Sequence, residues 1–167
     1  DEEVRALVAD NSSSPMTILK QLSRDEDEEV RCEVAYNSNT PVEVLKQLAQ
    51  DEDEEVRAFV AKNSSTPVEL LQQLAQDNHS FVTCAVASNP NTPEALLKKL
   101  SVKDISSIAY SFLYGAIAPA LVASNPSTPV DVLQQLAQDQ EEQIRAGVAS
   151  NPNTPAELLQ QLISNEL

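Results

Sequence analysis

The feature that most constrains the fold of this chain is an internal repeat. Asparagine recurs at six positions with spacings of 26, 26, 26, 36 and 26 residues, and a proline follows each asparagine four residues later. The asparagines are Asn11, Asn37, Asn63, Asn89, Asn125 and Asn151. A fixed period of this length is typical of repeat arrays, in which each unit buries its apolar face against its neighbours. The sequence therefore predicts six repeats of 26 residues, with ten extra residues between the fourth and the fifth.

Each repeat begins with one short helical segment, best seen in residues 51–74, DEDEEVRAFVAKNSSTPVELLQQL. The segment follows an acidic stretch that suits a helix N-terminus, and it carries apolar residues four apart, such as Val56 and Val60. It ends near Asn63, since asparagine tolerates a left-handed conformation at a helix end. We also expect the six asparagines to form a stacked ladder that satisfies backbone groups between repeats.

A second helical segment begins at the Thr-Pro pair of each repeat. Thr66 is expected at the cap position and Pro67 at the first helical position, and Thr66 with Glu69 matches a capping box. Leu71 and Leu74 then supply a buried stripe. Neither segment is longer than about a dozen residues, which is marginal for an isolated helix in water. Stacking between repeats must stabilise both segments, so the predicted fold is an all-α solenoid.

The motif V-R-x-x-V-A-x-N-P-x-T-P-x-x-L-L-x-x-L closely resembles that of the leucine-rich repeat variant family. The resemblance covers nearly the whole chain except about residues 102–117, which contain the insertion. It implies a right-handed superhelix over residues 1–167, a single domain of alternating helices, some of them of the tighter 3₁₀ type, related in architecture to HEAT and armadillo arrays. The chain begins and ends close to repeat boundaries, as a segment of a longer array would. A founding member of the family carries a cysteine-rich iron–sulfur segment, which this sequence lacks.

The charge balance narrows the classes of partner. The chain has 26 acidic and 11 basic side chains, a net charge of -15. Such a surface repels phosphate backbones and anionic membranes, so we expect no nucleic-acid partner and no membrane partner. No run of about 18 uncharged apolar residues free of proline and glycine predicts a membrane span.

The two cysteines are predicted to be structural. Cys32 and Cys84 lie 52 residues apart, which is two full periods, so they occupy the same slot of different repeats. A disulfide needs Cα atoms within about 7 Å, which two intervening layers of helix do not allow. The same slot holds Ala6, Ala58, Ala120 and Ala146. A small buried residue is therefore expected there, and two unpaired thiols indicate a reducing, cytoplasmic setting.

The charged residues that recur in register are also predicted to be structural. Four arginines, Arg5, Arg31, Arg57 and Arg145, each follow an acidic residue by four positions. This spacing predicts ion pairs along one helix face. His79, the only histidine, stands in the slot of that acid in the fourth repeat. The acidic runs lack the spacing of a calcium loop, and no phosphate loop, nucleophile elbow or zinc helix is present. We therefore expect no catalytic residues, no metal and no cofactor.

Two slots of the first helix differ most between the repeats, and they indicate where a partner could bind. One slot holds Leu7, Glu33, Phe59, Ala85, Leu121 and Gly147, and the slot three residues later holds Asp10, Tyr36, Lys62, Ser88, Ser124 and Ser150. Residues three apart share a helix face. The first hypothesis is a non-catalytic protein-interaction scaffold that uses Tyr36, Phe59 and Lys62, because aromatic anchors dominate interface energies. The alternative is that both slots are surface with few constraints.

The insertion suggests a second binding site. Residues 105–130 contain no charged side chain, and they include Tyr110, Phe112 and Tyr114. These rings either fill a gap in the core or form an exposed apolar patch for a partner or a homodimer. The alternative function is then a self-associating structural repeat protein. A HEAT-like enzyme that modifies DNA rests on fold analogy alone, and the acidic surface argues against it.

Overall fold

The computed structural model describes residues 1–101 and 117–164. Within these residues the chain forms twelve helices and no strand, and consecutive helices pack on one another as in a repeat solenoid. Contacts between residues divide the chain into two units, Asp1–Asn89 and Pro90–Leu167. The predicted all-α solenoid is confirmed. The number of repeats, the single domain and the insertion stay predictions, because residues 102–116 lie outside the described part.

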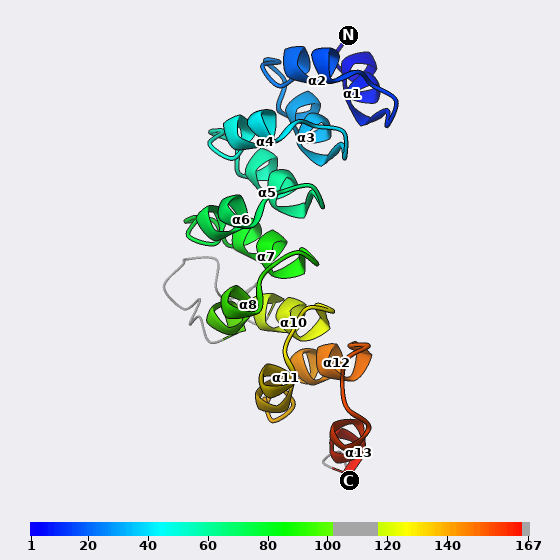
Figure 1. The fold of residues 1–167 in the computed structure, drawn as a ribbon, viewed down its shortest axis with the longest axis vertical. Coiled ribbons are helices and arrows are strands. Elements are labelled where there is room, and N and C mark those ends of the chain that lie inside the picture. The colour runs from blue at the N-terminus through cyan, green and yellow to red at the C-terminus, as the bar shows by residue number, and fades with distance from the viewer. Residues whose placement is uncertain (102–116, 165–167) are drawn as a thin grey trace. The chain divides into compact units, whose positions relative to one another are not determined.

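The first unit contains seven helices, which alternate between nine and seven residues in length. They are α1 (Glu2–Asp10), α2 (Met16–Leu22), α3 (Glu28–Tyr36), α4 (Val42–Leu48), α5 (Glu54–Lys62), α6 (Val68–Leu74) and α7 (Ser80–Ser88). The longer helices α1, α3, α5 and α7 stack directly on one another, and each shorter helix packs against the two longer helices that flank it in sequence. Figure 1 shows α2, α4 and α6 along one side of this stack.

The second unit is built in the same way from the helices that the structure describes. They are α8 (Glu94–Ser101), α10 (Ile117–Ser124), α11 (Val130–Leu136), α12 (Glu142–Ser150) and α13 (Ala156–Ser164). Helix α10 packs between α8 and α12, and α11 lies against α10 and α12. All helices of the described residues are α-helices, so the 3₁₀ type that the resemblance implies for some of them is not found in this part of the chain.

The core consists of the apolar positions that the sequence pattern indicates. Val56 and Val60 of α5 are fully buried, and Leu71 and Leu74 of α6 are 0% and 2% exposed. Since these residues lie where consecutive helices meet, the apolar stripe of each repeat is covered by the next repeat. Burial of each such side chain stabilises the fold by about 1.5–3 kcal/mol relative to leaving it in water.

The asparagines form the expected ladder. The Nδ2 atom of Asn63 donates to the carbonyl oxygens of Ala35 at 2.7 Å and Asn37 at 3.0 Å, both in the preceding repeat. Its Oδ1 atom accepts from the backbone nitrogen of Ser65. Asn37, Asn89 and Asn151 donate in the same way. The predicted left-handed conformation is wrong, because Asn63 has φ −65° and ψ 124° and no described residue has a positive φ.

The threonine of the Thr-Pro pair does not cap the second helix as predicted. Pro67 occupies the N-cap position of α6 without any side-chain cap bond. The hydroxyl of Thr66 instead donates to the carbonyl oxygen of Val60, at 2.5 Å, near the end of the preceding helix. Thr40, Thr128 and Thr154, and Ser14 in the first repeat, make the equivalent bond. The hydroxyl thus gives a second donor to a carbonyl near the helix end, which also accepts from the backbone nitrogen of Asn63 at 3.2 Å, and it links the end of α5 to the turn before α6.

The arginine ion pairs join different repeats, not residues four apart as predicted. The guanidinium of Arg57 donates through Nε and Nη2 to the two carboxylate oxygens of Asp77, at 2.7 and 3.2 Å. Arg5 and Arg31 form the same two-pronged pair with the aspartate twenty residues later. The acid four residues before Arg57, Asp53, caps α5 instead by accepting from the backbone nitrogens of Glu55 and Val56. The carboxylate of Asp53, which the sequence pattern paired with Arg57, is therefore used as the N-cap of α5.

Candidate functional site

The structure brings together the three first-helix residues predicted to bind a partner. Tyr36 of α3 and Phe59 of α5 pack edge to face, with ring centroids 5.8 Å apart at an interplanar angle of 82°. The Nζ atom of Lys62 lies 4.8 Å from the centroid of the Phe59 ring. The three residues come from neighbouring repeats because α3 and α5 stack directly. They form one continuous surface of the first unit.

A fourth residue, Phe81 of α7, belongs to this surface and was missed by the sequence argument. Its ring lies 5.0 Å from the Nζ atom of Lys62, so the ammonium sits over two phenyl rings from consecutive repeats. Phe81 occupies a slot that holds Glu3, Glu29 and Glu55 in the earlier repeats. The change from glutamate to phenylalanine in this slot was the sequence signal that could have identified Phe81. We call Tyr36, Phe59, Lys62 and Phe81 the aromatic face.

The aromatic face is more exposed than the scaffold around it. Tyr36 is 53% and Phe81 43% exposed, Lys62 is exposed, and Phe59 is half-buried. An open depression of about 330 Å³ adjoins Tyr36 and Lys62, and Asp10 forms part of its wall. Such contacts between a cation and aromatic rings contribute about 0.5–1 kcal/mol at exposed sites. The contacts therefore hold the rings in place while leaving much of their surface accessible.

The variable slots are not surface in every repeat. Ala85 is 2% exposed, and Gly147 is buried. A Cβ atom on Gly147 would lie 2.8 Å from the carbonyl oxygen of Ala120 and 2.8 Å from the Cβ of Ala123. Gly147 therefore permits the close approach of α10 and α12, and it does not contribute to a binding face as its slot predicted. The slot three residues later is exposed throughout.

Glu33 lies next to the aromatic face, on the same side of α3 as Tyr36. Its carboxyl group is half-buried, and burial raises its pKa, followed by the charges of Asp10 and Glu29. Among the ion pairs of the described residues, none includes Glu33 or Lys62. The basic residue of the aromatic face, Lys62, contacts the rings of Phe59 and Phe81. The acids beside the aromatic face, Asp10, Glu29 and Glu33, thus take part in none of the ion pairs of the described residues.

The cysteines and the histidine do not form a reactive site in the described part of the chain. Cys32 and Cys84 are buried and unpaired, and burial raises the pKa of the Cys32 thiol to about 12. Ala146, in the same slot, is exposed, so the slot is not buried in every repeat. His79 lies 3.8 Å from Glu54 through Nδ1, and no group of three potential metal ligands occurs among the described residues.

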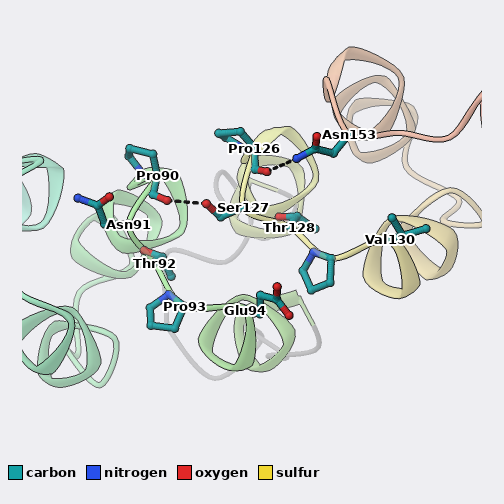
Figure 2. Close-up of a pocket in the computed structure, with 11 residues that line it drawn as sticks. Pro90, Asn91, Thr92, Pro93, Glu94, Pro126, Ser127, Thr128, Val130 and Asn153 are labelled. Carbon is teal, nitrogen blue, oxygen red and sulfur yellow. Dashed lines mark hydrogen bonds between the residues drawn. The ribbon is translucent and has the colours of Figure 1, made fainter.

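The second unit contains a hollow of about 670 Å³ between its inter-helix loops (Figure 2). Ser127 donates from Oγ to the carbonyl oxygen of Pro90, and Asn153 donates from Nδ2 to that of Pro126, each at 2.5 Å. Glu94 is the only titratable residue in the lining. Because its polar side chains join one loop to the next, we assign this hollow to the stacking of the loops.

Family models account for these repeats. The leucine rich repeat variant model matches two consecutive segments, residues 28–53 and 54–79. The Leucine Rich Repeat Variant domain model matches residues 118–165. Together the matched segments cover more than half of the chain, and the first two reproduce the 26-residue period. The chain belongs to the leucine-rich repeat variant family. The family resemblance is thus confirmed, and the fold of this leucine-rich repeat variant is that of a structural repeat scaffold.

Two solved structures are similar to this leucine-rich repeat variant over most of its length. One is a leucine-rich repeat variant described as having a novel repetitive structural motif, with 26% sequence identity, a TM-score of 0.45, and coverage of 92% of this chain and 72% of that one. The other is the crystal structure of an engineered protein, with 21% identity, a TM-score of 0.42, and coverage of 97% and 90%. Among curated proteins, no sequence matches significantly.

Two further sequence predictions for this leucine-rich repeat variant concern its insertion and the membrane. Tyr110, Phe112 and Tyr114 lie outside the described residues, so the aromatic insertion and the homodimer proposed through it stay predictions. None of the helices in residues 1–101 and 117–164 is long and apolar enough to cross a bilayer.

Proposed function

We propose that this leucine-rich repeat variant is a non-catalytic scaffold that binds another protein through the aromatic face. The observation that carries the proposal is the exposure of Tyr36 and Phe81, at 53% and 43%, on α3 and α7, which flank α5 in a stack whose core side chains are covered. Large aromatic side chains are enriched in protein interfaces, and a few of them supply most of the binding energy. Stacked repeats commonly use one such continuous face to hold a partner.

The geometry of the aromatic face supports this proposal in a second way. Tyr36 packs against Phe59, and Lys62 bridges Phe59 and Phe81, so each side chain is already restrained in the unbound chain. Ordering a side chain on binding costs about 0.5–1.5 kcal/mol. A pre-organised group of rings avoids much of that cost, which favours binding by a rigid surface.

The test compares partner capture by matched variants. The wild type, Tyr36→Ala/Phe59→Ala and the control Met16→Ala/Val68→Ala are immobilised, and captured proteins are quantified by mass spectrometry. Met16 and Val68 are exposed apolar residues of the shorter helices, so the control also removes exposed apolar surface. We expect at least one specific partner to be retained by the control and reduced about tenfold or more by the aromatic variant.

The folding of each variant is checked by circular dichroism, because Phe59 is half-buried. Tyr36→Ala alone, at an exposed position, serves if the double variant loses helicity. Equal capture of every protein by the wild type and by a folded variant without Tyr36 would refute the proposed binding face.

A further inference from the structure

The acidic residues beside the aromatic face indicate the charge of the partner that this face would bind. Glu29, Glu33 and Tyr36 follow one another at helical spacing along one side of α3, and Asp10 reaches the same place from α1. Glu33 is half-buried among these like charges, whose mutual repulsion raises its pKa after the larger effect of burial. An ionised carboxylate in such a place lowers the stability of the fold. A cation bound at this place would favour the ionised form of Glu33 and remove that cost.

The basic side chains nearby are already engaged elsewhere. Arg5 and Arg31 bind the aspartates of the following repeats, and Arg31 also donates to the carbonyl oxygens of Asp25 and Glu26. Lys62 lies over two phenyl rings. A cation from outside the chain would therefore pair with Glu33 and its neighbours without displacing an ion pair of the described residues.

Resting on the function proposed above, we propose that the aromatic face binds a basic segment of a partner protein. Lysine or arginine side chains of that segment would pair with Asp10, Glu29 and Glu33, while an apolar side chain or an arginine plane would pack on the exposed ring of Tyr36. An aromatic face flanked by acids suits arginine in particular, because guanidinium both pairs with carboxylates and stacks on rings.

Charge complementarity favours this occupant over the alternatives. Residues 1–89 hold eighteen acidic and seven basic side chains, a net charge of −11. A second copy of the chain would bring the same negative charge to the contact, and a nucleic acid would bring phosphates, so both are repelled. A basic segment is attracted, and its association is steered to this side.

The test measures fluorescence anisotropy with three short labelled peptides. The basic probe repeats arginine, leucine, lysine and serine, the acidic probe has glutamate in place of both cations, and the neutral probe has glutamine there. Each is titrated with the wild type, with Glu29→Gln/Glu33→Gln, and with the control Glu43→Gln/Glu69→Gln. The control removes the same charge from exposed first-turn positions of α4 and α6, so it corrects for the overall attraction of an acidic protein.

We expect saturable binding of the basic probe only. Glu29→Gln/Glu33→Gln should weaken it about tenfold, and the control variant less than about twofold. Tyr36→Ala should also weaken it about tenfold. Since Glu29→Gln/Glu33→Gln removes like charges, the variant should keep the melting temperature of the wild type or exceed it, so a loss of binding is not a loss of fold.

Four results would overturn the basic-segment proposal. They are no saturable binding of the basic probe, equal binding of the neutral or acidic probe, equal losses in the acid and control variants, and a dimer that Tyr36→Ala abolishes in light scattering. If the aromatic variant loses its captured protein while Glu29→Gln/Glu33→Gln keeps it, the proposed scaffold function stands and the basic partner is wrong. If neither variant loses any protein, both proposals are wrong.

Discussion

The constant residues of the repeat are explained by backbone groups that they satisfy. Asn63 forms three hydrogen bonds from one amide, two to carbonyl oxygens of the preceding repeat and one from the nitrogen of Ser65. Aspartate could accept the last bond but not donate the other two, and leucine could do neither. Buried carbonyl groups without partners are costly, so the position requires an amide of this length.

We predict that Asn63→Ala lowers the free energy of unfolding by about 1–3 kcal/mol, because the buried carbonyl oxygen of Ala35 loses its amide donor, whereas that of Asn37 still accepts from the backbone nitrogen of Thr40. The measurement is urea unfolding followed by circular dichroism. Asn39→Ala is the control: Asn39 is exposed, and its amide donates only to the carbonyl oxygen of Ser12, so its loss should cost less than about 1 kcal/mol. Equal effects of the two substitutions would mean that the asparagine ladder contributes nothing special to stability.

At the scale of helices, the arginine–aspartate pairs connect one repeat to the next. Asp77 lies in the turn before α7, accepts both prongs of Arg57, and also accepts from the backbone nitrogen of His79. Burial acts to raise the pKa of Asp77, but these hydrogen bonds and the positive charge of Arg57 outweigh it, so the pKa is lowered. The ionised carboxylate therefore stabilises the stacked repeats.

This linkage predicts a pH dependence for Arg57→Met. A lowered folded-state pKa gives stability above the unfolded pKa of about 4, and that stability is lost as the pH falls through the folded pKa. Removing Arg57 leaves burial to raise the pKa of Asp77. The variant should therefore be less stable by about 2–4 kcal/mol near neutral pH, and the difference should shrink below about pH 4.

Urea unfolding of the wild type and Arg57→Met at a series of pH values measures this difference. Lys98→Met is the control, because the Lys98–Asp131 pair is exposed and solvent screens it, so its loss should change stability far less at every pH. A difference that stays constant across the acid range would assign the effect to the bonds from Arg57 to the carbonyl oxygens of Asp51 and Glu52 instead.

The helices also show where sequence reasoning succeeds and where it stops. Apolar spacing predicted the buried pair Val56 and Val60, because helical periodicity depends only on the chain itself. It could not predict that Arg57 prefers Asp77 to Asp53, since two repeats in contact make distant residues neighbours. It also gave no measure of how closely two helices approach, which is why Gly147 was assigned to a surface face.

The candidate site was partly accessible from the sequence for the same reason. Comparing repeats selected Tyr36, Phe59 and Lys62, since equivalent slots of stacked helices must adjoin. Phe81 was missed because it lies one helical turn earlier in its repeat, and only the position of the Lys62 ammonium between the two phenyl rings joins it to the others. A long side chain such as that of Lys62 contacts residues outside its own slot, and the spacing of residues in the sequence does not predict such contacts.

At the scale of the whole chain, the acidic side chains far outnumber the basic side chains that could neutralise them. The net charge is -15, and the acidic starts of α3 and α5 each place several carboxylates close together. Like charges on a compact chain repel one another, whereas the unfolded chain spreads them apart. The part-buried arginine pairs are screened less by salt than these exposed acids are.

We therefore predict that the melting temperature rises by a few degrees when sodium chloride is increased from about 20 mM to about 300 mM, since the screening length shortens over this range. Scanning calorimetry at constant pH measures the change. In Glu28→Gln/Glu54→Gln, which removes one exposed or half-buried acid from each of α3 and α5, the rise should be smaller. A melting temperature that falls with added salt would mean that the arginine pairs, and not the repulsion among the acids, dominate the electrostatic free energy of the fold.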